Sequence, residues 1–230
     1  MEEGVIKFQL DFSATGPVDM ELIADLNRWR NTLWQHALIG QDPARYEGSG
    51  FGTVSQRIGS EDAARGKRRF IISGTQTGQL SELDSSHYTL VTRYDAASNS
   101  VSAEGPIKPS SESLTHGMIY DLDNTIRTVL HVHSPDIWLA ADSLGIPVTD
   151  SAVPYGTPQM AAEVQRLFNE TDVRKQKIFS MGGHEDGIVS FGTTAEEAGD
   201  ILLRALDALS LIHISEPTRR RDSSRMPSSA

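Results

Sequence analysis

The chain has 230 residues, no cysteine and a formal net charge of −10. Without cysteine there is neither a disulfide framework nor a thiolate metal site, so a transition metal would have to be held by histidine and carboxylate side chains. The excess of acidic residues disfavours nucleic acid as a partner. No apolar run is long enough to span a membrane, and the acidic N-terminal sequence is unlike a signal peptide. These two features predict a cytoplasmic location.

The first half of the chain combines short strands with one long helix. Residues 5–12 alternate apolar and polar side chains, which predicts a strand. Residues 19–38 carry apolar side chains at helical spacing after an acidic first turn, and a polar, glycine-rich loop follows over 40–50. Further strands are predicted over 52–58 and 68–73, and a hairpin over 88–94 and 100–103.

The second half interleaves helices and strands irregularly. A helix over 111–124 is expected to open on a serine cap, and Thr157 and Pro158 are typical of the start of a helix over 157–169. The irregular order favours an α/β fold with a mixed sheet between helices. The other expected elements are strands over 127–133, 177–181 and 187–191, a helix near 136–144, and a last helix that opens at 194.

The C-terminal segment differs from the rest. Residues 209–219 and 224–230 match the translation of a transposon-type sequencing adapter, with a variable index between them. We therefore interpret 209–230 as adapter read-through that is expected to be disordered, and residues 1–208 as a single domain. The alternative is a genuine basic tail in which Arg219-Arg220-Arg221 forms a localisation or phosphate-binding patch.

Two histidines in the predicted strand over 127–133 indicate a metal site. His131 and His133 are two residues apart, so in a strand their side chains point to the same face. A third histidine, His184, lies in the glycine-rich turn Gly182-Gly183-His184-Glu185-Asp186-Gly187. Three imidazoles suit a Zn²⁺ ion, or another divalent transition metal, with one coordination position left open for a substrate.

The segment Ser110-Ser111-Glu112 lies at the predicted start of a helix. The N-terminus of a helix favours anions, because its backbone N–H groups and the helix dipole point toward them. The two hydroxyls are therefore candidates for holding an anionic group of a substrate, while the carboxylate of Glu112 is a candidate acid/base group.

The order of these motifs resembles the class II aldolase/adducin family. The resemblance is carried by the segment from Lys108 to Ser134, which includes both Ser110-Ser111-Glu112 and His131-Val132-His133-Ser134, and by His184 with the sequence Phe191-Gly192-Thr193-Thr194 that follows it. It implies a three-layer α/β/α sandwich, a homotetramer with active sites near the subunit interfaces, and a zinc-dependent enzyme of carbohydrate metabolism. The family also contains adducin, whose related domain is not catalytic.

Roles carry over from the family position by position. The resemblance implies that His131, His133 and His184 bind zinc, that Glu112 is the acid/base group, and that Ser110 and Ser111 bind the anionic end of the substrate. Three further residues with hydroxyl groups lie in the segments that correspond to the family's other anion-binding positions. This chain has Gly52-Thr53-Val54-Ser55 and Ser73-Gly74-Thr75-Gln76 there, which differ from the family's usual residues. These further candidates are Thr53, Ser73 and Thr75.

The departures at those positions leave the substrate open between a sugar phosphate and a non-phosphorylated hydroxy acid or sugar acid. The tyrosine of the aldolases has no clear counterpart, and Tyr155 is the nearest candidate proton donor. The leading hypothesis is a zinc-dependent lyase that breaks or forms a C–C bond in a small hydroxy-carbonyl substrate. The alternatives are an epimerase or a dehydratase at the same site, a metal-dependent hydrolase, and an adducin-like binding domain without catalysis.

Overall fold

The computed structural model describes residues 4–215, which form an eight-stranded mixed sheet with helices on both faces. The strand order is β1-β7-β6-β5-β4-β8-β10-β9. Only β1 and β7 pair in parallel among these neighbours, and the other pairs are antiparallel. The strands of this sheet are β1 (Gln9–Ala14), β4 (Thr53–Arg57), β5 (Phe70–Ser73), β6 (Tyr88–Asp95), β7 (Ser100–Gly105), β8 (Thr128–His133), β9 (Ile178–Ser180) and β10 (Gly187–Gly192).

Two short strands and nine helical segments complete the described elements. The short strands, β2 (Gly40–Gln41) and β3 (Gly50–Phe51), form a separate antiparallel ribbon. The α-helices are α1 (Ala24–Gln35), α2 (Ser113–Leu122), α3 (Pro135–Leu139), α4 (Pro158–Glu170), α5 (Val173–Gln176) and α6 (Ala195–Ser215). The 3-10 helices are η1 (Met20–Ile23), η2 (Tyr46–Gly48) and η3 (Ser85–His87).

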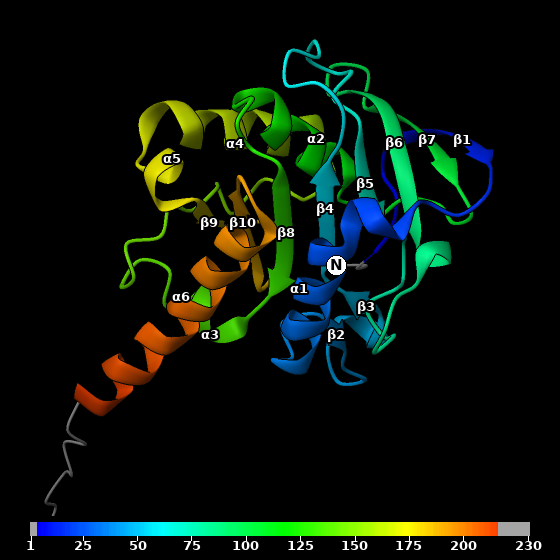
Figure 1. Cartoon of the computed structure of the whole chain (residues 1–230). Coiled ribbons are helices and arrows are strands. Elements are labelled where there is room, and N and C mark those ends of the chain that lie inside the picture. Colours follow the sequence, from blue (N-terminus) through cyan, green and yellow to red (C-terminus); the bar gives the residue numbers. More distant parts are fainter. Residues whose placement is uncertain (1–3, 216–230) are drawn as a thin grey trace, which may run out of the picture.

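Each face of the sheet has its own apolar core, which gives the three layers expected from the sequence (Figure 1). Residues of α2, α4 and α5 pack on one face, and residues of η1, α1, α3 and α6 pack on the other. The alternation within β8 follows this division, because Val129 belongs to the first core while Leu130 and Val132 belong to the second. The α/β/α sandwich with a mixed sheet is therefore confirmed.

Several boundaries differ from the sequence-based expectation. The strand expected over 5–12 starts at Gln9, where the Gln9 amide donates to the Asn99 carbonyl and the ladder with β7 begins. The helix expected over 19–38 is divided, since Ile23, the last residue of η1, has a non-helical backbone at the N-cap position of α1. The expected serine cap is wrong, because α2 has Glu112 at its N-cap position and no side-chain cap bond there.

The last helix, α6, continues to Ser215 and so enters the segment that we interpret as read-through. Residues 216–230 lie outside the described residues, and the division at 208 stays a prediction. Within the described chain, no helix combines the length and apolar character needed to cross a membrane.

Candidate metal centre

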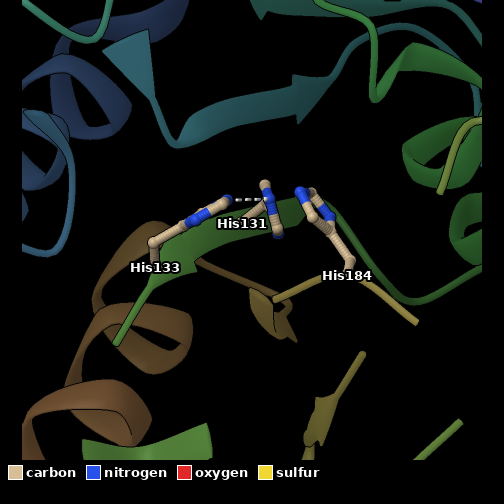
Figure 2. A group of neighbouring side chains, drawn as sticks. All are labelled: His131, His133 and His184. Atoms are coloured by element: carbon tan, nitrogen blue, oxygen red, sulfur yellow. Dashed lines mark hydrogen bonds between the residues drawn. The ribbon is translucent and has the colours of Figure 1, made fainter. Parts of the chain in front are cut away.

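Strand β8, an interior strand of the sheet, holds two of the predicted ligands. It lies between β4 and β10, with His131 opposite Thr53 on one side and Val189 on the other. Both imidazoles are almost completely buried, with 1% of each residue exposed. The Nε2 atoms of His131 and His133 are 3.2 Å apart, so the two rings converge as the strand periodicity predicted (Figure 2).

The third histidine reaches the same place from the turn between β9 and β10. The His184 amide donates to the Met181 carbonyl at 3.1 Å, and the Gly187 amide donates to the His184 carbonyl at 2.9 Å. These bonds fix a tight turn that places the His184 ring beside the other two, with ring centroids 5.0 Å from His131 and 4.8 Å from His133. Figure 2 shows the three rings gathered at the end of β8.

The turn requires glycine at position 183. A Cβ atom added to Gly183 would lie 1.9 Å from the Val153 carbonyl oxygen, which is closer than any real contact. We expect Gly183→Ala to lower the free energy of unfolding by about 1–3 kcal/mol and to weaken zinc binding, because the backbone must shift and carry His184 with it. Thermal unfolding and zinc titration of the variant measure both effects.

Gly16→Ala is the matched control for this substitution. A Cβ atom at Gly16 would meet nothing within 4 Å. Its free energy of unfolding should therefore stay within about 0.5 kcal/mol of the wild-type value. If Gly183→Ala and Gly16→Ala had the same free energy of unfolding and the same zinc affinity, the turn around His184 would be less constrained than its contacts indicate.

The geometry and protonation of the cluster fit a divalent transition metal. One ligand atom from each of the three histidines lies within 4.8 Å of the others. Two imidazole nitrogens bound to one tetrahedral zinc lie about 3.3 Å apart, since each Zn–N bond is about 2.0–2.1 Å, and the His131–His133 separation is close to this value. Burial, reinforced by the neighbouring His184, lowers the pKa of both His131 and His133 well below the usual range. Both rings are thus neutral at neutral pH, which is the form that binds a metal.

Glu112 presents a buried carboxylate to this cluster. Only 2% of the residue is exposed, and its Oε1 atom is 3.6 Å from Nδ1 of His184. The carboxylate comes from the start of α2, whereas the histidines come from β8 and the β9–β10 turn. The structure therefore brings together the three predicted ligands and the predicted acid/base group from three separate segments.

Tyr155 lies against the cluster through the face of its ring. The ring stacks on His184, with centroids 4.3 Å apart and an interplanar angle of 23°, and the residue is fully buried. The Lys7 ammonium lies 3.4 Å from the centroid of the Tyr155 ring and donates to the Tyr155 carbonyl at 3.3 Å. Tyr155 is thus next to one predicted metal ligand, and its role as a proton donor stays a prediction.

Four of the five predicted anion-binding residues line one cavity next to the histidines, which we name the polar cavity. Its walls come from Gly4 and from residues within 50–53, 74–78 and 110–111, including Thr53, Thr75, Ser110 and Ser111. Thr53 and Ser110 share a hydrogen bond of 2.7 Å between their hydroxyls. Ser73 does not line the cavity, because its hydroxyl is buried and accepts a hydrogen bond from the Val54 amide.

The sequence analysis missed a group of side chains beside His133. The rings of Tyr46 and Phe51 lie 4.7 Å and 5.3 Å from the His133 ring, measured between centroids. Arg45 donates to the Asp186 carboxylate at 2.7 Å, and the Tyr46 hydroxyl donates to the same oxygen. These contacts join the loop over 40–50 to the turn that carries His184. The only sequence signal was an aromatic and a basic residue within a glycine-rich loop.

His116 is an interior residue that is not among the three converging histidines. It is completely buried, and its Nδ1 atom shares a 2.7 Å hydrogen bond with Ser55, whose hydroxyl also bonds the Tyr120 hydroxyl at 2.7 Å. Burial lowers the pKa of His116 to about 3. This neutral imidazole belongs to a hydrogen-bonded group that joins His116 and Tyr120 of α2 to Ser55 of β4, the strand next to β8.

The sheet between two helical layers, with buried histidines converging at a central strand, defines an α/β sandwich protein with a site suited to a metal ion. The family model described as "Class II Aldolase and Adducin N-terminal domain" matches residues 44–210, and the chain belongs to this family. No curated protein matches the sequence closely enough to count as a relative.

Solved structures of two aldolases, and of a protein described as an aldolase, epimerase or decarboxylase candidate, have the same fold. YgbL from Escherichia coli is 17% identical, with a TM-score of 0.62 over 88% of this chain and 93% of that chain. A sugar-phosphate aldolase from Thermotoga maritima is 16% identical, with a TM-score of 0.60 over 86% of this chain and 97% of that chain. An L-fuculose-1-phosphate aldolase from Thermus thermophilus is 16% identical, with a TM-score of 0.58 over 87% and 100% of the two chains. At these identities the likeness establishes the fold alone.

Proposed function

We propose that this protein is a zinc-dependent lyase that cleaves or forms a C–C bond in a small hydroxy-carbonyl substrate with an anionic end. The observation that supports this most strongly is the buried Glu112 carboxylate, 3.6 Å from the imidazole of His184 at the edge of the three-histidine cluster. A domain that served only as a scaffold would gain nothing from burying a carboxylate beside three converging imidazoles, because burial of ionisable groups is costly.

Each residue has a distinct task in this proposal. When bound by the three histidines, zinc would polarise the carbonyl of the substrate and stabilise the negative charge that develops next to it. In the cleavage direction, Glu112 accepts the proton of the hydroxyl group as the C–C bond breaks. The bonding electrons remain with the carbonyl-bearing fragment, and Glu112 returns the proton to its carbon, so the products are two carbonyl compounds.

The hydroxyl groups that line the polar cavity would bind oxygen atoms of the anionic end of the substrate, because the cavity itself has room for little more than one water molecule. Ser111 directly precedes Glu112 in the chain, and Thr53 lies opposite His131 in the sheet, so the cavity adjoins both the carboxylate and the histidines. Tyr155 supports the His184 ring by stacking and is the alternative candidate to Glu112 for donating the proton to the carbon of the departing fragment. The family resemblance further suggests a homotetramer, and the composition of the chain is the basis for proposing a cytoplasmic location.

A substrate screen of the zinc-loaded full chain tests this function. Matched pairs of sugar phosphates and sugar acids would be offered, and the aldehyde released by cleavage would be measured. We expect cleavage that stops on chelation and returns with Zn²⁺, Mn²⁺ or Co²⁺. Epimerised or dehydrated products without cleavage would assign the same site to those reactions. A protein that binds no metal and converts none of the compounds would favour an adducin-like binding domain.

A further inference from the structure

Arg30 is a buried charge directly behind the polar cavity. It lies on α1 with 1% of the residue exposed. Within the part of the chain that the structure describes, its guanidinium donates hydrogen bonds to backbone carbonyls alone, those of Ser81 at 3.0 Å, Thr77 at 3.0 Å and Gly78 at 3.3 Å. Burial lowers the pKa of Arg30, yet an arginine side chain keeps its charge in proteins. Among the described residues, no carboxylate forms an ion pair with it.

The carbonyls that Arg30 binds belong to peptide groups at the wall of the polar cavity. Thr77 and Gly78 both line the cavity. In a trans peptide the N–H points away from the C=O, so a guanidinium that holds the carbonyls of residues 77 and 78 turns the following N–H groups to the opposite side. The nitrogens of Gly78 and Gln79 lie 3.4 Å and 3.3 Å from the Cβ position of Gly50, which also lines the cavity. Arg30 thus holds the carbonyl ends of these peptide groups, and their nitrogens lie on the side of Gly50.

The lining of the polar cavity lacks a charge of its own. Every described residue that lines it is glycine, serine, threonine or glutamine. Hydroxyls and N–H groups can bind an anion, but they do not balance its charge. The Arg30 guanidinium, separated from the cavity by single peptide groups, is a fixed positive charge in a region where burial weakens solvent screening. An unpaired buried cation is costly to a folded protein, which makes a ligand anion its natural counterion.

We propose that Arg30 is a positioning residue for the anionic end of the substrate, and that its charge makes the polar cavity prefer a dianion such as a phosphate group over a carboxylate. Arg30 does not touch the ligand in this role. It acts through the peptide groups of residues 77–79 and through its charge. The inference rests on the proposed function only in taking the polar cavity as the place where the anionic end of the substrate binds.

Arg57 provides a matched control for the test. It is also 1% exposed, and its guanidinium also donates to three backbone carbonyls, those of Asn124, Ser60 and Glu61 at 2.8–2.9 Å. It lies on β4 four residues beyond Thr53, at roughly 13 Å along the strand from that wall of the cavity. Substitution of Arg57 therefore removes the same kind of structural support without removing the charge behind the cavity.

Calorimetric titration of the zinc-loaded full chain with inorganic phosphate tests the proposal, with a parallel titration of the chelated protein to separate binding at the metal. We expect Arg30→Gln to weaken phosphate binding about tenfold or more, while Arg57→Gln changes it less than twofold. Arg30→Lys, which keeps a charge, should retain more affinity than Arg30→Gln. Zinc stoichiometry should be the same in all variants. Equal weakening by Arg30→Gln and Arg57→Gln, or equal affinities of Arg30→Lys and Arg30→Gln, would overturn the proposal.

A comparison within the wild-type protein keeps the test decisive if Arg30→Gln does not fold. Methylphosphonate and methylsulfonate have similar shapes, but only the first is a dianion at pH 8. We expect methylphosphonate to bind about tenfold more tightly in both the zinc-loaded and the chelated protein, and equal binding would contradict the role of the charge. These readouts do not depend on turnover. Absence of lyase activity would therefore refute the proposed function while leaving the role of Arg30 to be decided by phosphate binding.

Discussion

Replacing His184 with alanine should lower the affinity of the protein for zinc by at least about a hundredfold and abolish turnover. The two histidines of β8 would remain, but they approach the site from one side only, and the third ligand comes from the turn between β9 and β10. Even groups that only orient metal ligands contribute about 10–100-fold to affinity, so loss of a ligand should cost more. Competition with a chromogenic chelator would measure the dissociation constant.

His36→Ala is the control for this variant. His36 is an exposed histidine at the end of α1, and it is not among the three that converge. The zinc affinity of the His36→Ala variant should equal that of the wild-type protein. If His184→Ala bound zinc as tightly as His36→Ala, the turn histidine would not be a ligand, and the proposed centre would lose its third imidazole.

Replacing Glu112 with glutamine should reduce kcat by about 10²–10⁴-fold while zinc remains bound. Glutamine has nearly the same size and shape, so the packing around the start of α2 should survive. The amide cannot accept and return a proton as the carboxylate does. Metal content, thermal unfolding and steady-state kinetics on the substrate found by screening would separate loss of proton transfer from loss of zinc or of the fold.

Glu185→Gln is the matched control for Glu112→Gln. Glu185 follows His184 in the chain, but its side chain is exposed, whereas Glu112 is buried against His184. We expect full turnover in Glu185→Gln. Turnover of Glu112→Gln at the level of this control would exclude the carboxylate of residue 112 from the reaction.

The sequence predicted those parts of the site that depend on local periodicity and turn chemistry. The alternation within 127–133 was sufficient to place His131 and His133 on one face, because the side chains of a strand alternate regardless of its partners. The glycines around His184 indicated a tight turn, and the structure shows why glycine is needed there. The family resemblance supplied the three-layer fold and the order of the motifs, both of which the structure and the family model confirm.

The parts that the sequence did not predict depend on contacts between distant segments. The packing of Tyr46 and Phe51 on His133 requires the loop over 40–50 to fold back over β8, and no local pattern encodes this. Ser73 resembled an anion-binding residue in the sequence, but its hydroxyl bonds a neighbouring strand. Arg30 lies within the helix that the sequence predicts over 19–38, and no local pattern sets it apart from the other polar residues there. Its burial becomes apparent only when the carbonyls of residues 77–81 surround it.

Anomalous X-ray diffraction at the zinc edge, from crystals of the zinc-loaded full chain, tests the central claim most directly. The expected result is one peak per chain, at about 2.0–2.1 Å from a ring nitrogen of each of His131, His133 and His184. A peak elsewhere, or none at this cluster under saturating zinc, would contradict the metal centre from which the proposed chemistry follows.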